Sequence, residues 1–268
     1  MGRERLSRKL DFLRERQEKA LVCYLMAGYP DLESSLQAFR SVLKSGADIL
    51  EIGFPFSDPV ADGITIQHAH EEALKRGTKF KDILYISSTL RQEFPDIPFI
   101  LMTYYNPMFK IGLERFCHLA KENGIDGFIV PDLPPEESEE LGSYTQKYQL
   151  SLILLASPTS SERRLKLICN HTDLLTYFIS ITGTTGARED LPLERLKENI
   201  RRYRENCQKP VVVGFGVSKG EHARAIGEFS DGVVVGSALV KLAGERNIED
   251  LSKKVKELKS SLKLCPKV

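Results

Sequence analysis

Glu51 is the one ionisable residue within a short apolar segment, Ile49 to Gly53. Such a segment is typical of a buried strand, in which successive side chains point to opposite faces. Leu50 and Ile52 then form an apolar face that must meet helices, so Glu51 points the other way, into the interior of a barrel near its mouth. Partial burial raises the pKa of a carboxyl group, which makes Glu51 a candidate acid–base at neutral pH. A carboxylate satisfied by a buried ion pair is the structural alternative.

Two aspartates and a tyrosine lie at or beyond the ends of strand-like segments. Asp62 lies in the loop Phe54 to Gly63, directly after the strand of Glu51, but Asp-Gly is a common turn pair, so the residue alone indicates a turn. Asp132 ends a later strand, where we expect it to orient neighbouring donors rather than to react. Tyr104 closes another strand and either reaches the pocket or, as is commoner, packs in the core.

Two glycine-rich turns follow the last two apolar runs, at Gly214 to Ser218 and at Gly236 to Ala238. Glycines leave backbone N–H groups open to a phosphate, and the second turn directly precedes a helical stretch whose dipole favours an anion. Either turn alone indicates only a tight connection, but the loops after strands 7 and 8 are where barrels commonly bind phosphate. A third loop, Gly183 to Arg188, either adds donors and closes over the site or is an ordinary loop.

These residues need a scaffold that gathers strand ends at one place. Apolar runs alternate with amphipathic helical stretches along the chain, which is typical of βα units around a parallel sheet. Eight such units without a linker favour a closed TIM barrel, a single (β/α)₈ domain over residues 1–268, rather than an open doubly wound sheet. An extra N-terminal helix, with Leu6, Leu10 and Leu13 on one face, is expected to plug the bottom. The eight predicted strands are Leu21 to Met26, Ile49 to Gly53, Phe99 to Tyr104, Gly127 to Val130, Leu152 to Leu155, Leu175 to Ile179, Val211 to Gly214 and Val233 to Gly236.

A turn pattern recurs before three of these strands. It reads Gly46-Ala47-Asp48, Gly124-Ile125-Asp126 and Ser230-Asp231-Gly232. Glycine suits the left-handed end of the incoming helix, and we expect the aspartate to bond the backbone of its own turn.

Composition excludes several classes of function. The 268 residues are 41% hydrophobic and 28% charged with a net charge of +1, which gives no electrostatic case for nucleic acid or an acidic membrane. Five scattered cysteines without a C-x-x-C spacing argue against a disulfide framework and a zinc site, and favour the cytoplasm. The histidines, with His68 and His70 two apart on a predicted helix, lack ligand or nucleophile spacing, so no metal is expected.

Taken together, these segments resemble the tryptophan synthase alpha chain family. The run Phe54-Pro55-Phe56-Ser57-Asp58-Pro59 with Ala61-Asp62-Gly63 is specific to it, because a generic phosphate-binding barrel has no reason to carry this run. The other matching motifs are Tyr24-Leu25-Met26-Ala27-Gly28-Tyr29-Pro30, Leu50-Glu51-Ile52-Gly53, Gln67, Tyr104 with Asn106-Pro107, Asp132-Leu133-Pro134 with Glu136-Glu137, Gly183-Thr184-Thr185-Gly186-Ala187-Arg188, Gly214-Phe215-Gly216-Val217 and Gly236-Ser237-Ala238.

The resemblance implies retro-aldol cleavage of indole-3-glycerol phosphate to indole and D-glyceraldehyde 3-phosphate, in tryptophan biosynthesis. Such a cleavage needs a base for the glycerol hydroxyl, an acid for the ring carbon and an anion beside the indole N–H. Glu51 matches the family's acid–base and Asp62 the aspartate that pairs with the indole nitrogen. Further matches are the phosphate binders Gly186, Gly216, Gly236 and Ser237, the loop threonine Thr185 that meets the aspartate, the substrate-side aromatics Tyr24, Tyr104 and Tyr177, and the supporting acid Asp132.

The resemblance also implies a partner, a pyridoxal-phosphate beta chain in an alpha-beta-beta-alpha tetramer, contacted near Phe54 to Asp62. No cofactor is expected on this chain, since pyridoxal phosphate belongs to the beta chain. Five positions depart from the family pattern and leave open the kinetics of the loop and the fit to the partner: Cys23, Met26, Glu72, Ile181 and Thr184.

Two alternatives remain. Indole-glycerol-phosphate synthase or a sugar-phosphate epimerase would need a lysine or metal-binding histidines at strand ends, and none of the eight predicted strands ends in either. A noncatalytic barrel subunit that allosterically activates the beta chain would be expected to have lost a carboxylate, whereas Glu51 and Asp62 are both present.

Overall fold

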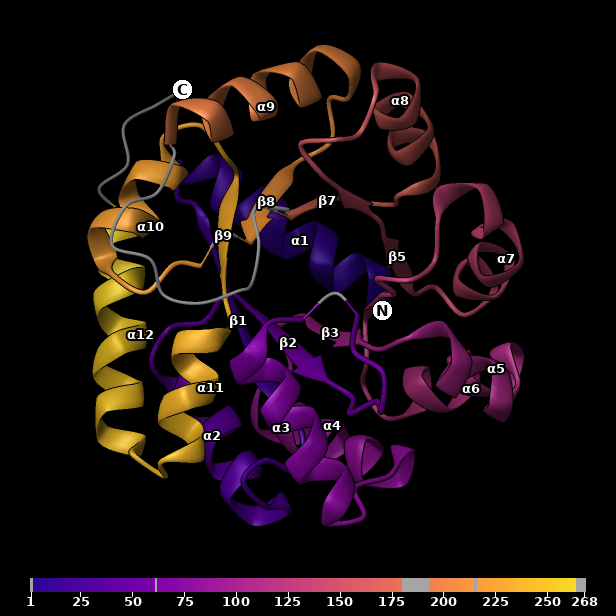
Figure 1. Cartoon of the computed structure of the whole chain (residues 1–268), viewed down its shortest axis with the longest axis vertical. Helices are drawn as coiled ribbons and strands as arrows, with labels where there is room; N and C mark the ends of the chain where they lie inside the picture. The colour runs from indigo at the N-terminus through magenta and orange to yellow at the C-terminus, as the bar shows by residue number, and fades with distance from the viewer. Residues whose placement is uncertain (1, 61, 180–192, 215, 264–268) are drawn as a thin grey trace.

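The computed structural model describes residues 2–60, 62–179, 193–214 and 216–263, in which parallel strands form a central ring surrounded by helices (Figure 1). The strands are β1 Ala20–Met26, β2 Ile49–Gly53, β3 Phe99–Met102, β4 Gly127–Ile129, β5 Ser151–Ile153, β6 Leu155–Ala156, β7 Thr176–Ile179, β8 Val211–Gly214 and β9 Gly232–Val235. The helices are α1 Gly2–Glu15, α2 Leu32–Lys44, α3 Ile64–Lys75, α4 Phe80–Glu93, α5 Tyr105–Ile111, α6 Leu113–Glu122, η1 Pro135–Glu137, α7 Glu139–Lys147, α8 Glu162–His171, α9 Leu193–Asn206, α10 Gly220–Gly227, α11 Ser237–Gly244 and α12 Ile248–Lys263.

The sheet is an eight-stranded barrel whose fifth strand is interrupted. Its order is β5-β4-β3-β2-β1-β9-β8-β7-β6, with every pairing parallel, and only Leu154 separates β5 from β6. The interruption has a local cause, because the N–H of Leu154 donates to Thr172 Oγ1 (3.0 Å) instead of to a neighbouring strand. The expected TIM barrel is confirmed, and each of the eight predicted strands overlaps an observed one.

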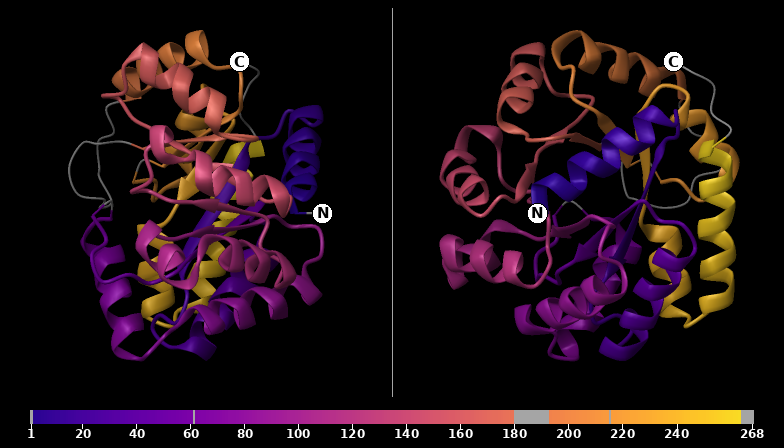
Figure 2. Two further views of the ribbon diagram at one scale, coloured as in Figure 1. Left: turned by 90° about the vertical axis from the view of Figure 1, so that its right-hand side faces the viewer. Right: turned by 180° about the vertical axis from the view of Figure 1, so that it is seen from behind.

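Two apolar layers, one in the barrel lumen and one between the barrel and its helices, explain which way the strand side chains point. The lumen is filled by residues that include Ile49, whereas Leu50 and Ile52 pack outward under the helices. Leu6 and Leu13 of α1 join the lumen cluster, and Leu10 packs against it. Figure 2 shows α1 lying across one end of the barrel. The predicted plug is therefore confirmed, and it leaves the opposite end, where the strands finish, for a site.

The recurring turn aspartates do not bond their own turns as expected. Each carboxylate accepts the N–H at the start of the preceding barrel strand, and a fourth aspartate, which lies outside the predicted pattern, does the same. The bonds are Leu21 N to Asp48 (2.8 Å), Phe99 N to Asp126 (2.8 Å), Val211 N to Asp231 (2.8 Å) and Leu152 N to Asp173 (2.7 Å). A basic side chain pairs with each: Lys259, Arg5 with Arg91, Arg204 and Arg3, respectively. Long-range strand pairing, rather than local turn chemistry, places these residues.

The scattered cysteines argued against a disulfide framework, but the structure contains one disulfide. Cys169, in the last turn of α8, forms a disulfide with Cys207, which directly follows α9. The two are 38 residues apart in sequence, but α8 and α9 pack side by side around the barrel, so sequence spacing concealed their proximity. Cys23 and Cys117 are buried free thiols, and Cys265 lies outside the described residues.

Neither a membrane helix nor a metal cluster occurs in the described ranges. No helix there is both long and apolar enough to cross a bilayer, and no three His, Cys, Asp or Glu side chains gather where they could hold a metal ion.

Candidate active site

Glu51 lies in the barrel lumen, with no polar partner among the residues that the structure describes. On β2 it is level with Tyr24 of β1 and Ile100 of β3, and it is fully buried. Neither carboxyl oxygen has a hydrogen-bond partner among the described residues, so the buried ion pair considered above is not found there. Burial, reinforced by the negative charge of Asp62, raises the pKa of Glu51 to about 8. The carboxyl group is therefore protonated at neutral pH and can both give and take a proton.

Asp62 is held by two side-chain donors at the same mouth of the barrel. The Tyr104 hydroxyl donates to Asp62 Oδ2 (2.9 Å), and His70 Nε2 lies 3.1 Å from the same oxygen. The Asp62 side chain is only 5% exposed. In the described part of the chain no hydrogen bond is made to Oδ1, which leaves that oxygen to accept from a ligand.

His70 is a site residue that the sequence reasoning missed. It lies on α3, the helix that follows Asp62, and its Nδ1 accepts the backbone N–H of Phe56 at 2.9 Å. A signal was present, because His70 falls on the buried face of α3 together with Ile66 and Ala73. A histidine among apolar side chains, eight residues after a candidate catalytic aspartate, was a reason to examine it.

Tyr24 and Tyr177 line the space around the two carboxyl groups. Tyr24 is buried and Tyr177 is partly buried. Loss of hydration raises both hydroxyl pKa values well above the ordinary range, with the charges of Glu51 and Asp62 adding to the effect. Both hydroxyls therefore stay protonated. Each lies over a strand-end glycine, since a Cβ on Gly53 would overlap the Tyr24 hydroxyl and one on Gly214 that of Tyr177.

The glycine turns adjoin these tyrosines. Gly236 caps α11, and its carbonyl accepts the N–H groups of Leu239 and Val240 (2.9 Å each), so the earlier amides of Ser237 and Ala238 lie free of the helix ladder at its start. A Cβ on Gly236 would lie 3.4 Å from the Tyr24 ring. Thr185 and Gly186 lie outside the described residues.

Gly216, in the turn after β8, has a φ of +59°, a left-handed conformation that glycine adopts without strain. Such turns orient successive N–H groups into a concave anion site.

Asp132 has a supporting position. Its carboxylate accepts the N–H of Tyr105 (2.9 Å), the first residue of α5 and the neighbour of Tyr104. It thus helps to fix the backbone that carries Tyr104 toward Asp62.

Three positions where the chain departs from the family pattern lie within the described residues, and none contacts the carboxyl pair. Cys23 and Met26 are buried on β1, and Glu72 pairs with Lys75 on the surface of α3 (2.9 Å). Ile181 and Thr184 lie outside the described residues.

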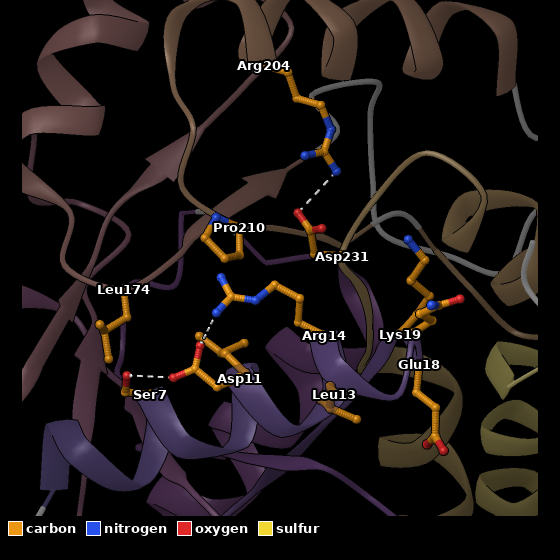
Figure 3. A pocket seen from close by; sticks show the side chains of 12 residues that line it. Ser7, Asp11, Leu13, Arg14, Glu18, Lys19, Leu174, Arg204, Pro210 and Asp231 are labelled. Carbon is orange, nitrogen blue, oxygen red and sulfur yellow. Dashed lines mark hydrogen bonds and ion pairs between the residues drawn. The ribbon is translucent and has the colours of Figure 1, made fainter. Parts of the chain in front are cut away.

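A cavity of about 610 Å³ lies at the other end of the barrel, beneath α1 (Figure 3). Its charged groups already pair, as Arg14 does with Asp11 (2.6 Å) and Arg204 with Asp231 (3.1 Å). It contains neither Glu51 nor Asp62, so it is separate from the candidate active site.

The chain is similar to known proteins over nearly its whole length. A family model described as tryptophan synthase alpha chain matches residues 10–266. A tryptophan synthase alpha chain of Aquifex aeolicus (strain VF5) is 68% identical over 259 residues, which cover 97% of this chain and 99% of the relative. One from Methanocaldococcus jannaschii is 44% identical and covers 92% of this chain and 86% of the relative.

Solved structures agree. A chain from Aquifex aeolicus VF5 superposes with a TM-score of 0.91 at 65% identity, covering 98% of this chain and 99% of that one. Tryptophan synthase subunit alpha of Legionella pneumophila str. Paris gives a TM-score of 0.90 at 34% identity, with 98% of each chain covered. The chain therefore belongs to the tryptophan synthase alpha chain family.

Proposed function

We propose that Glu51 and Asp62 catalyse the reaction of this family in this chain. That reaction is the retro-aldol cleavage of indole-3-glycerol phosphate to indole and D-glyceraldehyde 3-phosphate, and the chain is accordingly a carbon–carbon lyase of tryptophan biosynthesis. The observation that carries the proposal is the pair of carboxyl groups at the barrel mouth. Among the described residues, Glu51, with its raised pKa, has no hydrogen-bond partner, and Asp62 is held through one oxygen while the other accepts no hydrogen bond.

The protonation state of Glu51 sets the order of events. Protonated Glu51 first gives its proton to C3 of the indole ring, and Asp62 stabilises the ring N–H as it becomes positive. The Glu51 carboxylate then takes the proton of the glycerol hydroxyl, the adjacent bond to C3 breaks, and its electron pair returns to the ring. Indole and an aldehyde leave, and Glu51 is protonated again.

The glycine turns hold the other end of the substrate. The amides of Ser237 and Ala238 and the turn at Gly216, together with Gly186, would bind the phosphate, aided by the dipole of α11. Tyr24, Tyr104 and Tyr177 would line the indole and glycerol portions between the turns and the carboxyl groups. Thr185 would complete the site by meeting Asp62, while Asp132 supports Tyr105.

The partner would be a tryptophan synthase beta chain, in an alpha-beta-beta-alpha tetramer. Val60 and Ile64 flank Asp62 with 81% and 72% of their surfaces exposed, which is an apolar exposure typical of an interface. Pyridoxal phosphate would belong to that partner, and this chain would need no cofactor of its own. We place the chain, as one domain, in the cytoplasm with the biosynthetic pathway of its family.

Glu51→Gln tests the proposal. Glutamine fills the same space but cannot exchange the proton, so indole release should fall at least about a thousandfold while binding of glycerol phosphate is kept. Glu249→Gln, the same change at a side chain 80% exposed on α12, is the control and should keep full activity. Full activity of Glu51→Gln would refute the assignment.

A further inference from the structure

We propose that His70 is a positioning residue that holds the Asp62 carboxylate for the indole nitrogen, an inference that rests on the proposed role of Asp62. His70 does not reach the substrate in this account. It acts through the hydrogen bond that it makes to Asp62 and through the loop to which it is tied.

The hydrogen bonds fix the tautomer of His70. A backbone N–H can only donate, so the bond from Phe56 N (2.9 Å) requires a lone pair on Nδ1. The proton of the neutral ring is then on Nε2, which lies 3.1 Å from Asp62 Oδ2 and donates to it. Because His70 is neutral in this arrangement, Asp62 keeps the full negative charge that the indole N–H needs.

Two donors on one oxygen orient the carboxylate. Tyr104 gives its hydroxyl proton to the same Oδ2 (2.9 Å), so rotation of Asp62 would break two hydrogen bonds. The Phe56 and Tyr104 rings stack with centroids 5.0 Å apart, and the His70 ring meets Tyr104 edge-on at 6.3 Å. One packed cluster thus consists of Phe56, Asp62, His70 and Tyr104. No other member of this cluster donates a hydrogen bond to Asp62 Oδ1.

His70 also connects two points of the loop after β2. It bonds Phe56 near the loop's beginning and Asp62 near its end, while itself standing on α3. The position of Asp62 is therefore set by the helix and by the near end of the loop as well as by its own backbone. The side chain of His70 is only 3% exposed, so water does not replace either bond readily.

Three substitutions of His70 distinguish its bond to Asp62 from its bond to Phe56. Glutamine at position 70 can place an amide N–H near the position of Nε2, asparagine can place an amide oxygen near that of Nδ1, and leucine can do neither. We expect His70→Leu and His70→Asn to lower kcat for indole release about 10- to 100-fold, the effect of losing a hydrogen bond to a charged group, with KM changed less than about threefold. His70→Gln should recover activity to within about fivefold of the parent chain.

His68→Gln is the matched control, because His68 lies on the same helix but is exposed, and it should leave kcat and KM unchanged. Nitrogen NMR of the labelled parent chain should show His70 neutral with its proton on Nε2. Thermal unfolding of each variant, with glycerol phosphate bound and free, shows whether it is folded with its phosphate site intact.

The outcomes distinguish this inference from the proposed function. Full activity of all three His70 variants, with Asp62→Asn inactive, would overturn the role of His70 and leave that of Asp62 standing. Recovery of activity in His70→Asn but not in His70→Gln would do the same. A His70 proton on Nδ1 would overturn it as well. Full activity of Asp62→Asn would overturn the proposed function and this inference together.

Discussion

A buried carboxyl group without a polar partner is costly unless it remains protonated. Glu51 has no such partner among the described residues, and its raised pKa keeps it protonated at neutral pH. Its position follows from strand alternation, since Leu50 and Ile52 must face the helices. The same burial that raises the pKa of Glu51 makes the stability of the fold depend on pH.

Between the ordinary value of 4.5 and the folded value of about 8, the folded chain keeps a proton at Glu51 that the unfolded chain has lost. The contribution of Glu51 to the free energy of unfolding is fully present below the unfolded-state pKa of 4.5. It falls as the pH rises, by up to about 1.4 kcal/mol per pH unit, until the pH exceeds the folded-state pKa. Glu51→Gln has no carboxyl group to titrate at this position. As the pH rises across this window, its free energy of unfolding should therefore increase relative to that of the parent chain. Denaturant unfolding of both proteins over the window measures the difference, and a constant difference would contradict the raised pKa.

Sequence reasoning predicted the direction of Glu51 because a strand has only two faces. It did not predict the role of His70, because a helix offers many directions and the partners of His70, Phe56 and Asp62, come from a loop whose path the sequence does not define. The missing information was tertiary: which loop atoms lie opposite that face of α3.

At the scale of elements, strand ends and helix starts form the site. The start of α11 offers the amides of Ser237 and Ala238, and Gly236 leaves room at the cap. The strand-end glycines Gly53 and Gly214 admit the tyrosine hydroxyls that border the carboxyl groups.

Gly236→Asp should weaken glycerol-phosphate binding at least about tenfold, because a carboxylate would repel the dianion and obstruct the amides. Gly236→Ala is the control for size, since its Cβ would be in ordinary contact with Tyr24 at 3.4 Å. Titration calorimetry with glycerol phosphate measures both variants. Equal affinity of Gly236→Asp and Gly236→Ala would show that the phosphate binds elsewhere.

The disulfide between α8 and α9 should stabilise the fold by limiting the unfolded chain. For a separation of 38 residues the chain-entropy relation gives about 4 kcal/mol, so the free energy of unfolding should fall by about that amount on reduction. Guanidinium unfolding with and without reductant measures this, and Cys207→Ala, which lacks the bond, should not respond to the reductant. Identical midpoints for the oxidised and reduced parent chain would contradict the bond's contribution.

The recurring turn aspartates show which contacts could not be predicted from neighbours in sequence. The glycines at positions 46 and 124 do adopt positive φ (+110° and +86°), as the turn pattern indicated. The side chains of Asp48 and Asp126, however, accept backbone N–H groups of residues 27 positions earlier, in the preceding strands. Propensity concerns neighbours in sequence, and it could not identify a partner that only barrel closure brings near.

For the whole molecule, the sequence was sufficient to predict the barrel, because eight alternating units without a linker have few ways to bury every apolar run. The plug by α1 followed from three leucines on one face. The break at Leu154 and the pairing of Cys169 with Cys207 did not follow, since both depend on contacts between different βα units.

The decisive experiment for Glu51 and Asp62 as catalysts is to measure the yield of indole from indole-3-glycerol phosphate with the purified parent chain, alone and with a tryptophan synthase beta chain. We expect the chain alone, without added cofactor, to form indole and D-glyceraldehyde 3-phosphate in equal amounts, and the beta chain to increase the rate. Binding of glycerol phosphate and activation of the beta chain without any release of indole would contradict it, and would instead identify the chain as a noncatalytic subunit.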